Sequence, residues 1–148
     1  MLYKKSDLPR GSKKLIRAWT FYDWANSVYS LVISSAIFPI YYSTHVFSDI
    51  NSILIFNIDI NKDTLISLLS GLCFLIIAFL SPMLSGIADY IGNKKIFMKF
   101  FVYMGSFSCM SLYWFELENI EISLLLYFFS LLGFWGSLVY YNSYLNDI

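Results

Sequence analysis

Three polar side chains that could bind a solute or carry a proton lie in the first long apolar stretch of the chain. Asp23, Asn26 and Ser30 are three and four residues apart, so they share one face if this stretch is a helix. A carboxylate within a bilayer is costly, and such a residue usually faces a protein interior or a water-filled cavity. In a dry pocket Asp23 could hold a proton, or it could pair with Arg17 or another basic residue of the bundle. Asn26 and Ser30 could instead bond neighbouring helices, but the three residues together predict a substrate or proton pathway.

A second group of candidate residues follows the second apolar stretch. Asp89 could accept hydrogen bonds from a helix N-terminus or pair with an arginine, and Gly92 permits a tight turn. Contacts of this kind are easily made and broken, which suits a gate. Lys94 and Lys95 have a simpler explanation, because cytoplasmic loops between membrane spans gather basic residues. The predicted cytoplasmic gate loop comprises Ser85, Gly86, Asp89, Gly92, Lys94 and Lys95.

The elements that must position these residues are long apolar stretches. Hydrophobic residues make up 58% of the 148-residue chain and charged residues only 14%, whereas soluble domains carry roughly 25% charged residues. Four stretches have about the 20 apolar residues that a membrane-spanning helix needs. We therefore predict an all-α membrane protein with four transmembrane helices, in a partial bundle over 18–148 that follows a basic segment at 1–17. The predicted spans are residues 18–42, 65–86, 96–115 and 122–144.

The charged residues predict the orientation of these helices. Basic residues gather before the first span and between the second and third, while the other two connections are mainly acidic. Segments rich in lysine and arginine stay on the cytoplasmic side. All four helices therefore agree with one topology, in which both termini are cytoplasmic.

Enzyme chemistry and nucleic-acid binding have no support in the sequence. We find no metal-ligand cluster, no serine or cysteine nucleophile near a histidine and no phosphate-binding glycine loop. Cys73 and Cys109 fall inside predicted spans, as small apolar residues do. We expect no enzyme activity, no cofactor, no metal and no nucleic-acid partner.

Two further patterns concern helix packing. Gly133 and Ser137 are four residues apart, with Gly136 beside them, and small residues at this spacing allow close helix approach in lipid. Aromatic residues gather at the ends of the predicted spans, which is typical of an interfacial belt. The aromatic residues concerned are Tyr41, Tyr42, Tyr113, Trp114, Tyr140 and Tyr141.

Several motifs resemble those of the major facilitator superfamily. Asp89, Gly92 and the lysine pair match the superfamily's cytoplasmic loop signature, with Ser85 in the position of its first glycine and Gly86 one place late. The stretch from Tyr22 to Ser27, Tyr-Asp-Trp-Ala-Asn-Ser, is similar to the first helix of the vacuole effluxer-like branch. The stretches at 38–42 and 140–145, Phe-Pro-Ile-Tyr-Tyr and Tyr-Tyr-Asn-Ser-Tyr-Leu, resemble the same branch.

The resemblance implies a secondary transporter whose first four helices are present here. Transporters of this superfamily have two six-helix halves, so we expect an N-terminal portion that works with remaining helices on the same or a separate chain. Expected partners are the lipid bilayer and a small solute, with amino acids as one candidate class. The expected location is the bacterial inner (plasma) membrane, or a vacuolar membrane in a eukaryote. The alternative is a small four-helix membrane protein that stabilises or regulates a partner.

Overall fold

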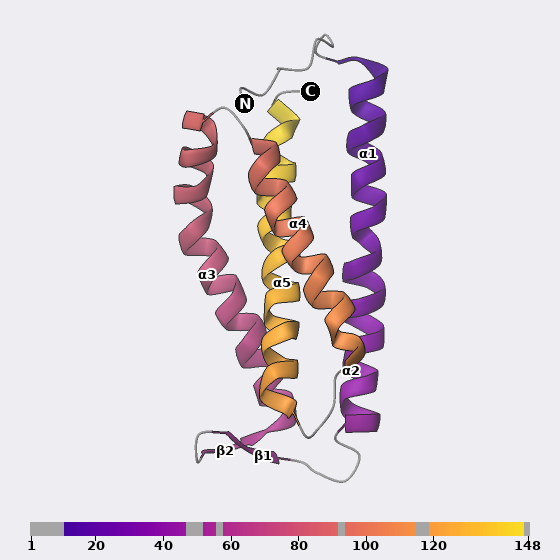
Figure 1. Cartoon of the computed structure of the whole chain (residues 1–148), viewed down its shortest axis with the longest axis vertical. Helices are drawn as coiled ribbons and strands as arrows, with labels where there is room; N and C mark the ends of the chain where they lie inside the picture. The colour runs from indigo at the N-terminus through magenta and orange to yellow at the C-terminus, as the bar shows by residue number, and fades with distance from the viewer. Residues whose placement is uncertain (1–10, 47–51, 56–57, 92–93, 115–118, 147–148) are drawn as a thin grey trace.

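Long helices make up most of the described chain, which in this computed structural model comprises residues 11–46, 52–55, 58–91, 94–114 and 119–146. In chain order the elements are α1 (Lys13–Val28), η1 (Tyr29–Ile37), α2 (Phe38–Tyr41), η2 (Tyr42–Val46), β1 (Ser52–Ile55), β2 (Ile58–Asn61), α3 (Lys62–Ile91), α4 (Lys94–Ser111), η3 (Leu112–Trp114), α5 (Ile120–Ser143) and η5 (Tyr144–Asn146). The helices run up and down side by side. The start of α1 and the end of α5 lie at one end of the bundle, here called the terminal end, and the strands lie at the other, the hairpin end (Figure 1).

The first helical segment changes its winding three times along its length, from α to π at Tyr29, back to α at Phe38 and to π again at Tyr42. Ser12 begins α1 by accepting a hydrogen bond from the Leu15 backbone N–H at 3.4 Å, as an N-cap residue does. From Tyr29 the winding becomes that of a π-helix, in which the Phe38 N–H reaches back five residues to the Ile33 carbonyl. Such wider turns are rare and occur mostly near functional sites. A regular helix over 18–42 does not describe this segment.

The connection after the first segment forms a small β-hairpin, which the sequence pattern did not predict. Strands β1 and β2 pair antiparallel, with Ser52 opposite Asn61. The Asn61 side chain then accepts a hydrogen bond from the Asp63 backbone N–H at 3.0 Å and so satisfies a free donor at the start of α3. Because Ile60 packs against the core, the hairpin is anchored to the end of the bundle.

Three described helices are long and apolar enough to cross a membrane: Lys62–Ile87, Lys94–Trp114 and Ile120–Ser143. This confirms the prediction of a helical membrane protein. Helix α3 continues to Ile91, past the predicted end of its span, and Pro82 lies within it. The segment around Ser85 and Gly86 is therefore helical, whereas we had predicted a loop there.

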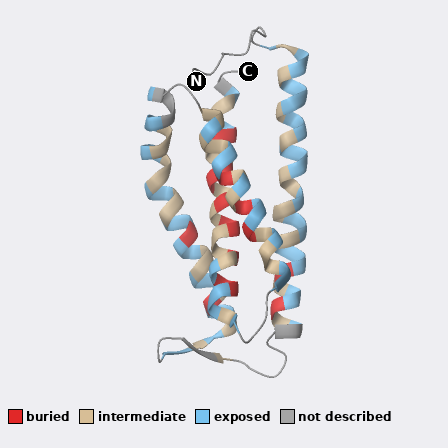
Figure 2. Cartoon of the chain, viewed as in Figure 1, coloured by how far each residue is buried: buried red, intermediate tan, exposed pale blue. Residues whose placement is uncertain are grey.

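Helix α5 is the central element of the bundle. Half of its most apolar stretch is buried, against 11% for each of the other two apolar helices, and buried residues gather along it in Figure 2. It packs against both α3 and α4. The contact with α4 is a backbone contact at Gly105 and Gly133, where an added Cβ on Gly133 would lie 2.4 Å from the Gly105 Cα. The predicted packing role of the small residues is confirmed at this glycine.

Two groups of buried side chains hold the bundle together. The larger lies toward the hairpin end, where the rings of Phe38 and Tyr127 stack with centroids 3.8 Å apart and the Tyr42 hydroxyl donates to the Lys62 carbonyl at 3.0 Å. The smaller one, nearer the terminal end, contains Phe101 and Tyr140. The interfacial-belt prediction is wrong for Tyr42, Tyr140 and Tyr141, because these three side chains are buried in the bundle.

Replacing Gly133 with alanine tests the close approach of α4 and α5. A Cβ at this position meets backbone atoms that cannot move aside, so we expect Gly133→Ala to lower the free energy of unfolding by about 1–3 kcal/mol. The measurement is thermal unfolding in detergent micelles, followed by circular dichroism.

Gly71→Ala is the matched control, since Gly71 lies in α3 with nothing within 4 Å of an added Cβ. There the better helix propensity of alanine should leave stability unchanged or raise it by up to about 1 kcal/mol. Equal losses in the two variants would refute the close approach of these two helices.

Candidate functional site

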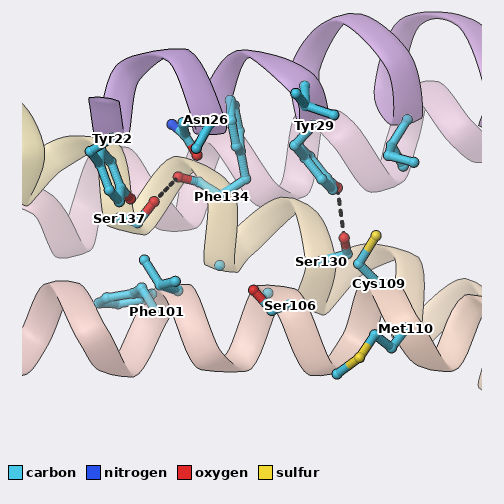
Figure 3. A pocket seen from close by; sticks show the side chains of 16 residues that line it. Tyr22, Asn26, Tyr29, Phe101, Ser106, Cys109, Met110, Ser130, Phe134 and Ser137 are labelled. Atoms are coloured by element: carbon cyan, nitrogen blue, oxygen red, sulfur yellow. Dashed lines mark hydrogen bonds between the residues drawn. The ribbon is translucent and has the colours of Figure 1, made fainter. Parts of the chain in front are cut away.

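A cavity of about 510 Å³ lies between the first helical segment, α4 and α5. Its size falls within the range of roughly 300–1,000 Å³ that is usual for small-molecule sites. Figure 3 shows side chains from all three elements pointing toward it. Most of the wall is apolar, and the lining hydroxyl and amide groups belong to Tyr22, Asn26, Tyr29, Ser106, Ser130 and Ser137.

The half of the cavity nearer the hairpin end is organised by a hydrogen bond between two side chains from distant parts of the sequence. The Ser130 hydroxyl of α5 donates to the phenol oxygen of Tyr29 at 2.8 Å, and Ser130 is fully buried. The ring of Tyr29 also stacks on Phe134, with centroids 4.8 Å apart. Tyr29 is the residue at which the π-helix begins, so the change in winding and the cross-helix bond occur at one place.

The half nearer the terminal end contains a buried phenol whose hydroxyl has no hydrogen-bond partner among the described residues. This is Tyr22, whose side chain lies beside Ser137 in Figure 3. The Ser137 hydroxyl donates to the Phe134 carbonyl at 2.8 Å. The Tyr22 hydroxyl lies close enough to Ser137 to interact with it but forms no hydrogen bond among the described residues, so its hydrogen can be donated to a ligand in the cavity.

Aromatic stacking attaches α1 to the end of α5 next to this phenol. The ring of Tyr141 lies 4.7 Å from that of Trp19 and 5.0 Å from that of Tyr22, centroid to centroid. The Tyr141 hydroxyl also donates to the Trp19 carbonyl at 3.5 Å. These contacts hold Tyr22 against α5 at the terminal end of the cavity.

The structure brings only one of the predicted pathway residues to the cavity. Asn26 lines it, on the same face of α1 as Tyr22. Asp23 is exposed and does not line the cavity, but it is close enough to the buried Tyr141 of α5 to interact with its hydroxyl. Ser30 donates to the Ser27 carbonyl of its own helix at 3.2 Å, a local bond that explains this serine without a ligand.

The predicted gate residues are described only in part. Ser85 and Gly86 are helical, the side chain of Asp89 is not described, and Gly92 lies outside the described residues. Lys94 donates to the Ser143 carbonyl at 3.5 Å, which places its charge at the C-terminal end of α5. A cation is favourable there because the last carbonyls of a helix are free and carry negative partial charge.

The chemistry available at the cavity is hydrogen bonding and aromatic contact. None of the described residues that line it is charged, and no cluster of three or more histidine, cysteine or acidic residues occurs in the described part of the chain. The sequence had pointed to Asn26, but it gave no indication of Tyr22, Tyr29 or Ser130. A phenol in an aromatic-rich helix has no distinctive spacing, and its partner is about a hundred residues away.

A comparison with family models identifies the chain. The model described as "Vacuole effluxer Atg22 like" matches residues 11–148. The chain belongs to this family.

A curated relative of the Atg22-like chain is the "Uncharacterized MFS-type transporter YxiO" of Bacillus subtilis (strain 168). The two are 36% identical over 132 residues, which cover 88% of this chain and 29% of the relative. The chain thus spans less than a third of the length of the relative it matches. No solved structure matches it.

The hydrogen bond between Tyr29 and Ser130 gives a test of how the first helical segment of this Atg22-like chain is attached to α5. Tyr29→Phe leaves the buried Ser130 hydroxyl without its phenol partner, so we expect a loss of about 0.5–1.5 kcal/mol in the free energy of unfolding. Thermal unfolding in micelles measures the loss.

The control is Tyr103→Phe, because Tyr103 is an exposed tyrosine of the neighbouring helix α4. This control should unfold as the unmodified chain does. If Tyr29→Phe also left stability unchanged, the bond would contribute nothing to the attachment of the first segment.

Proposed function

We propose that this chain forms the first four membrane helices of a secondary active transporter, which moves a small solute by alternating access. The observation that carries the proposal is the family match from residue 11 to residue 148, because it includes the Asp23 region and the region around Asp89. The description of the relative as an MFS-type transporter supports the same reading. This role is not enzymatic, and a small regulatory membrane protein is not favoured.

This proposal adds one span to the three apolar helices described above. The added span is the first helical segment, over residues 18–42. Its winding is helical without a break from Lys13 to Val46, which supports a span even though α-helix and π-helix alternate along it. Residues 1–17 are then a basic cytoplasmic N-terminus, and 18–148 form part of the transporter's N-terminal bundle. The other three spans coincide with α3, α4 and α5.

The charge distribution supports cytoplasmic termini. The start of α1 carries Lys13, Lys14 and Arg17, and the start of α4 at the same end of the bundle carries further lysines. The hairpin end carries the acidic residues Asp59 and Asp63. Because lysine and arginine stay on the cytoplasmic side, the terminal end faces the cytoplasm in this proposal.

Two segments take part in transport under this proposal. Asp23, with Asn26 and Ser30, contributes to the pathway of the solute or of a coupled proton. The segment at 85–95, with Asp89 and the lysine pair, forms a cytoplasmic gate. The contact of Lys94 with the end of α5 supports the gate, since a single long side chain can release a carbonyl at little cost.

Amino acids are the candidate solute class that the resemblance to the vacuole effluxer-like branch implies, and the description of the matching model as a vacuole effluxer supports export of a solute. The bacterial source of the relative supports a bacterial plasma membrane. The remaining helices, on the same or a separate chain, complete the pathway. Purified alone, the chain should therefore not exchange amino acids across liposomes.

Reporter insertions test the proposed topology. A fluorescent protein fused after residue 148 should fluoresce, because it folds in the cytoplasm, and alkaline phosphatase inserted between residues 56 and 57 should be active, because it folds outside. As the control, the two reporters are exchanged between the two positions. In that arrangement the fluorescent protein should not fluoresce and the alkaline phosphatase should be inactive. Phosphatase activity after residue 148 would contradict cytoplasmic termini.

Substitution of Asp23 tests the pathway. In cells that express the chain with the helices that complete the transporter, Asp23→Asn should lower uptake or efflux of radiolabelled amino acids by about tenfold or more. A lost interaction with a charged group, worth about 1.5–3 kcal/mol, corresponds to that factor. Asp59→Asn, in the exposed hairpin, is the matched control and should transport normally. Proton-coupled transport that persists unchanged in Asp23→Asn would exclude the carrier role.

A further inference from the structure

The cavity between the first helical segment, α4 and α5 has hydrogen-bond donors in both its halves. Tyr22 and Tyr29 are seven residues apart, two turns of helix, and both line the cavity. Two turns rise roughly 10 Å along the helix axis, so the two phenols can reach opposite ends of a bound molecule. Figure 3 shows Tyr22 and Tyr29 on one helix, with Asn26 between them.

Both phenols have a hydrogen to donate. The Tyr22 hydroxyl is buried and has no partner among the described residues. Tyr29 accepts a hydrogen bond from Ser130, so its oxygen is occupied as an acceptor while its own hydrogen is free for another group. A buried donor without a partner is unfavourable, and a ligand with an acceptor at each end would satisfy both.

The wall between the two donors is apolar and partly flat. The ring of Phe134 stacks on Tyr29, and the backbone of Gly105 and Gly133 forms part of the lining without side chains. Aromatic rings favour stacked or edge-on contacts with another ring. A flat apolar body therefore fits between the two phenols.

A charged ligand does not fit this chemistry. The lining residues given by the structure include no acidic and no basic side chain, and Asp23 lies outside the cavity on an exposed face. A charge moved from water into such surroundings loses its hydration and finds no countercharge. The same penalty applies to each end of a free amino acid.

We propose that the cavity binds an uncharged amphipathic compound with a planar apolar body and a hydrogen-bond-accepting oxygen at each end. The proposal goes beyond the proposed transport function, because it assigns to this bundle a ligand that is distinct from the amino acids proposed there as the solute. It separates two tasks: the cavity binds the neutral ligand, and the charge of Asp23 serves the proposed transport.

The test measures binding of three probes to the purified full chain in detergent micelles by equilibrium dialysis. The first is a radiolabelled biphenyl with one hydroxymethyl group at each end. The second is the matching biphenyl dicarboxylate, and the third is phenylalanine as a zwitterion. We expect saturable binding of the neutral diol, and binding at least about a hundredfold weaker for the two charged probes. Micelles without protein correct for partitioning.

Variants then assign the binding to the two donors. Tyr22→Phe and Tyr29→Phe should each weaken binding of the diol by about three- to tenfold, the effect of one neutral hydrogen bond. Tyr103→Phe, on the exposed face of α4, should bind as the unmodified chain does. Size-exclusion chromatography and thermal unfolding show whether each variant is folded.

Each other outcome overturns the inference. The inference fails if binding of the diol is not saturable. It also fails if a folded Tyr22→Phe, Tyr29→Phe double variant binds the diol as well as the unmodified chain does. It fails as well if the dicarboxylate or phenylalanine binds as tightly as the diol. The ranking of probes is measured on the unmodified chain and so remains decisive if a variant fails to fold. Failed binding with intact Asp23-dependent transport would refute only this inference. If the diol binds but the transport and topology tests fail, only the proposed function is refuted.

Discussion

The backbone contact between Gly105 and Gly133 is the constraint on which the rest of the bundle depends. In lipid, apolar side chains gain little by meeting each other, so helices associate through close packing and hydrogen bonds. The two glycines allow α4 and α5 to approach until an added Cβ on Gly133 would clash with the backbone. This contact sets α5 at the centre, with α3 packed against α5 as well. The first helical segment then takes its position from α5.

That first segment is attached to α5 in three places. Toward the hairpin end Phe38 stacks on Tyr127, and at the terminal end Tyr141 stacks on Trp19. Between these stacks Tyr29 bonds to Ser130. The cavity lies along this line of contacts, where small residues of α4 and α5, among them Gly105, Ser130 and Gly133, line it beside larger ones such as Phe134. The same small side chains that permit close packing of α4 and α5 therefore leave space beside them.

Much of the fold could be predicted from the sequence because the signals were local. Apolar stretches of adequate length indicated the helices, and the spacing of Gly133 and Ser137 indicated close packing. The hairpin was missed because Ser52 to Asn61 has no strong turn signal. The π-helix was missed because it depends on which backbone carbonyl each N–H reaches, and the residues from Tyr29 to Ile37 suit an ordinary helix equally well.

The candidate site was predicted only where one residue sufficed to indicate it. Asn26 is conspicuous in an apolar helix, and it does line the cavity. Tyr22 and Tyr29 were not singled out, because their role depends on partners in α5 that local spacing cannot reveal. Tyr140 and Tyr141 were assigned to a membrane interface from their position near the end of a predicted span, yet both are buried in the bundle. Position along a span therefore does not distinguish a lipid-facing tyrosine from one at the centre of a bundle.

The exposure of Asp23 links the described bundle to the remainder of the proposed transporter. Asp23 follows Tyr22 by one residue and is thus turned about 100° around the helix from the cavity. Its exposed neighbours are the large apolar residues Phe21 and Trp24. Lipid cannot favourably cover a carboxylate on such a face, so water or further helices must. The chain spans 29% of its relative's length, and the proposed transporter would supply further helices for this face. The site proposed for a neutral ligand inside the bundle and the exposed charge of Asp23 would then be coupled through α1, which carries both Tyr22 and Asp23.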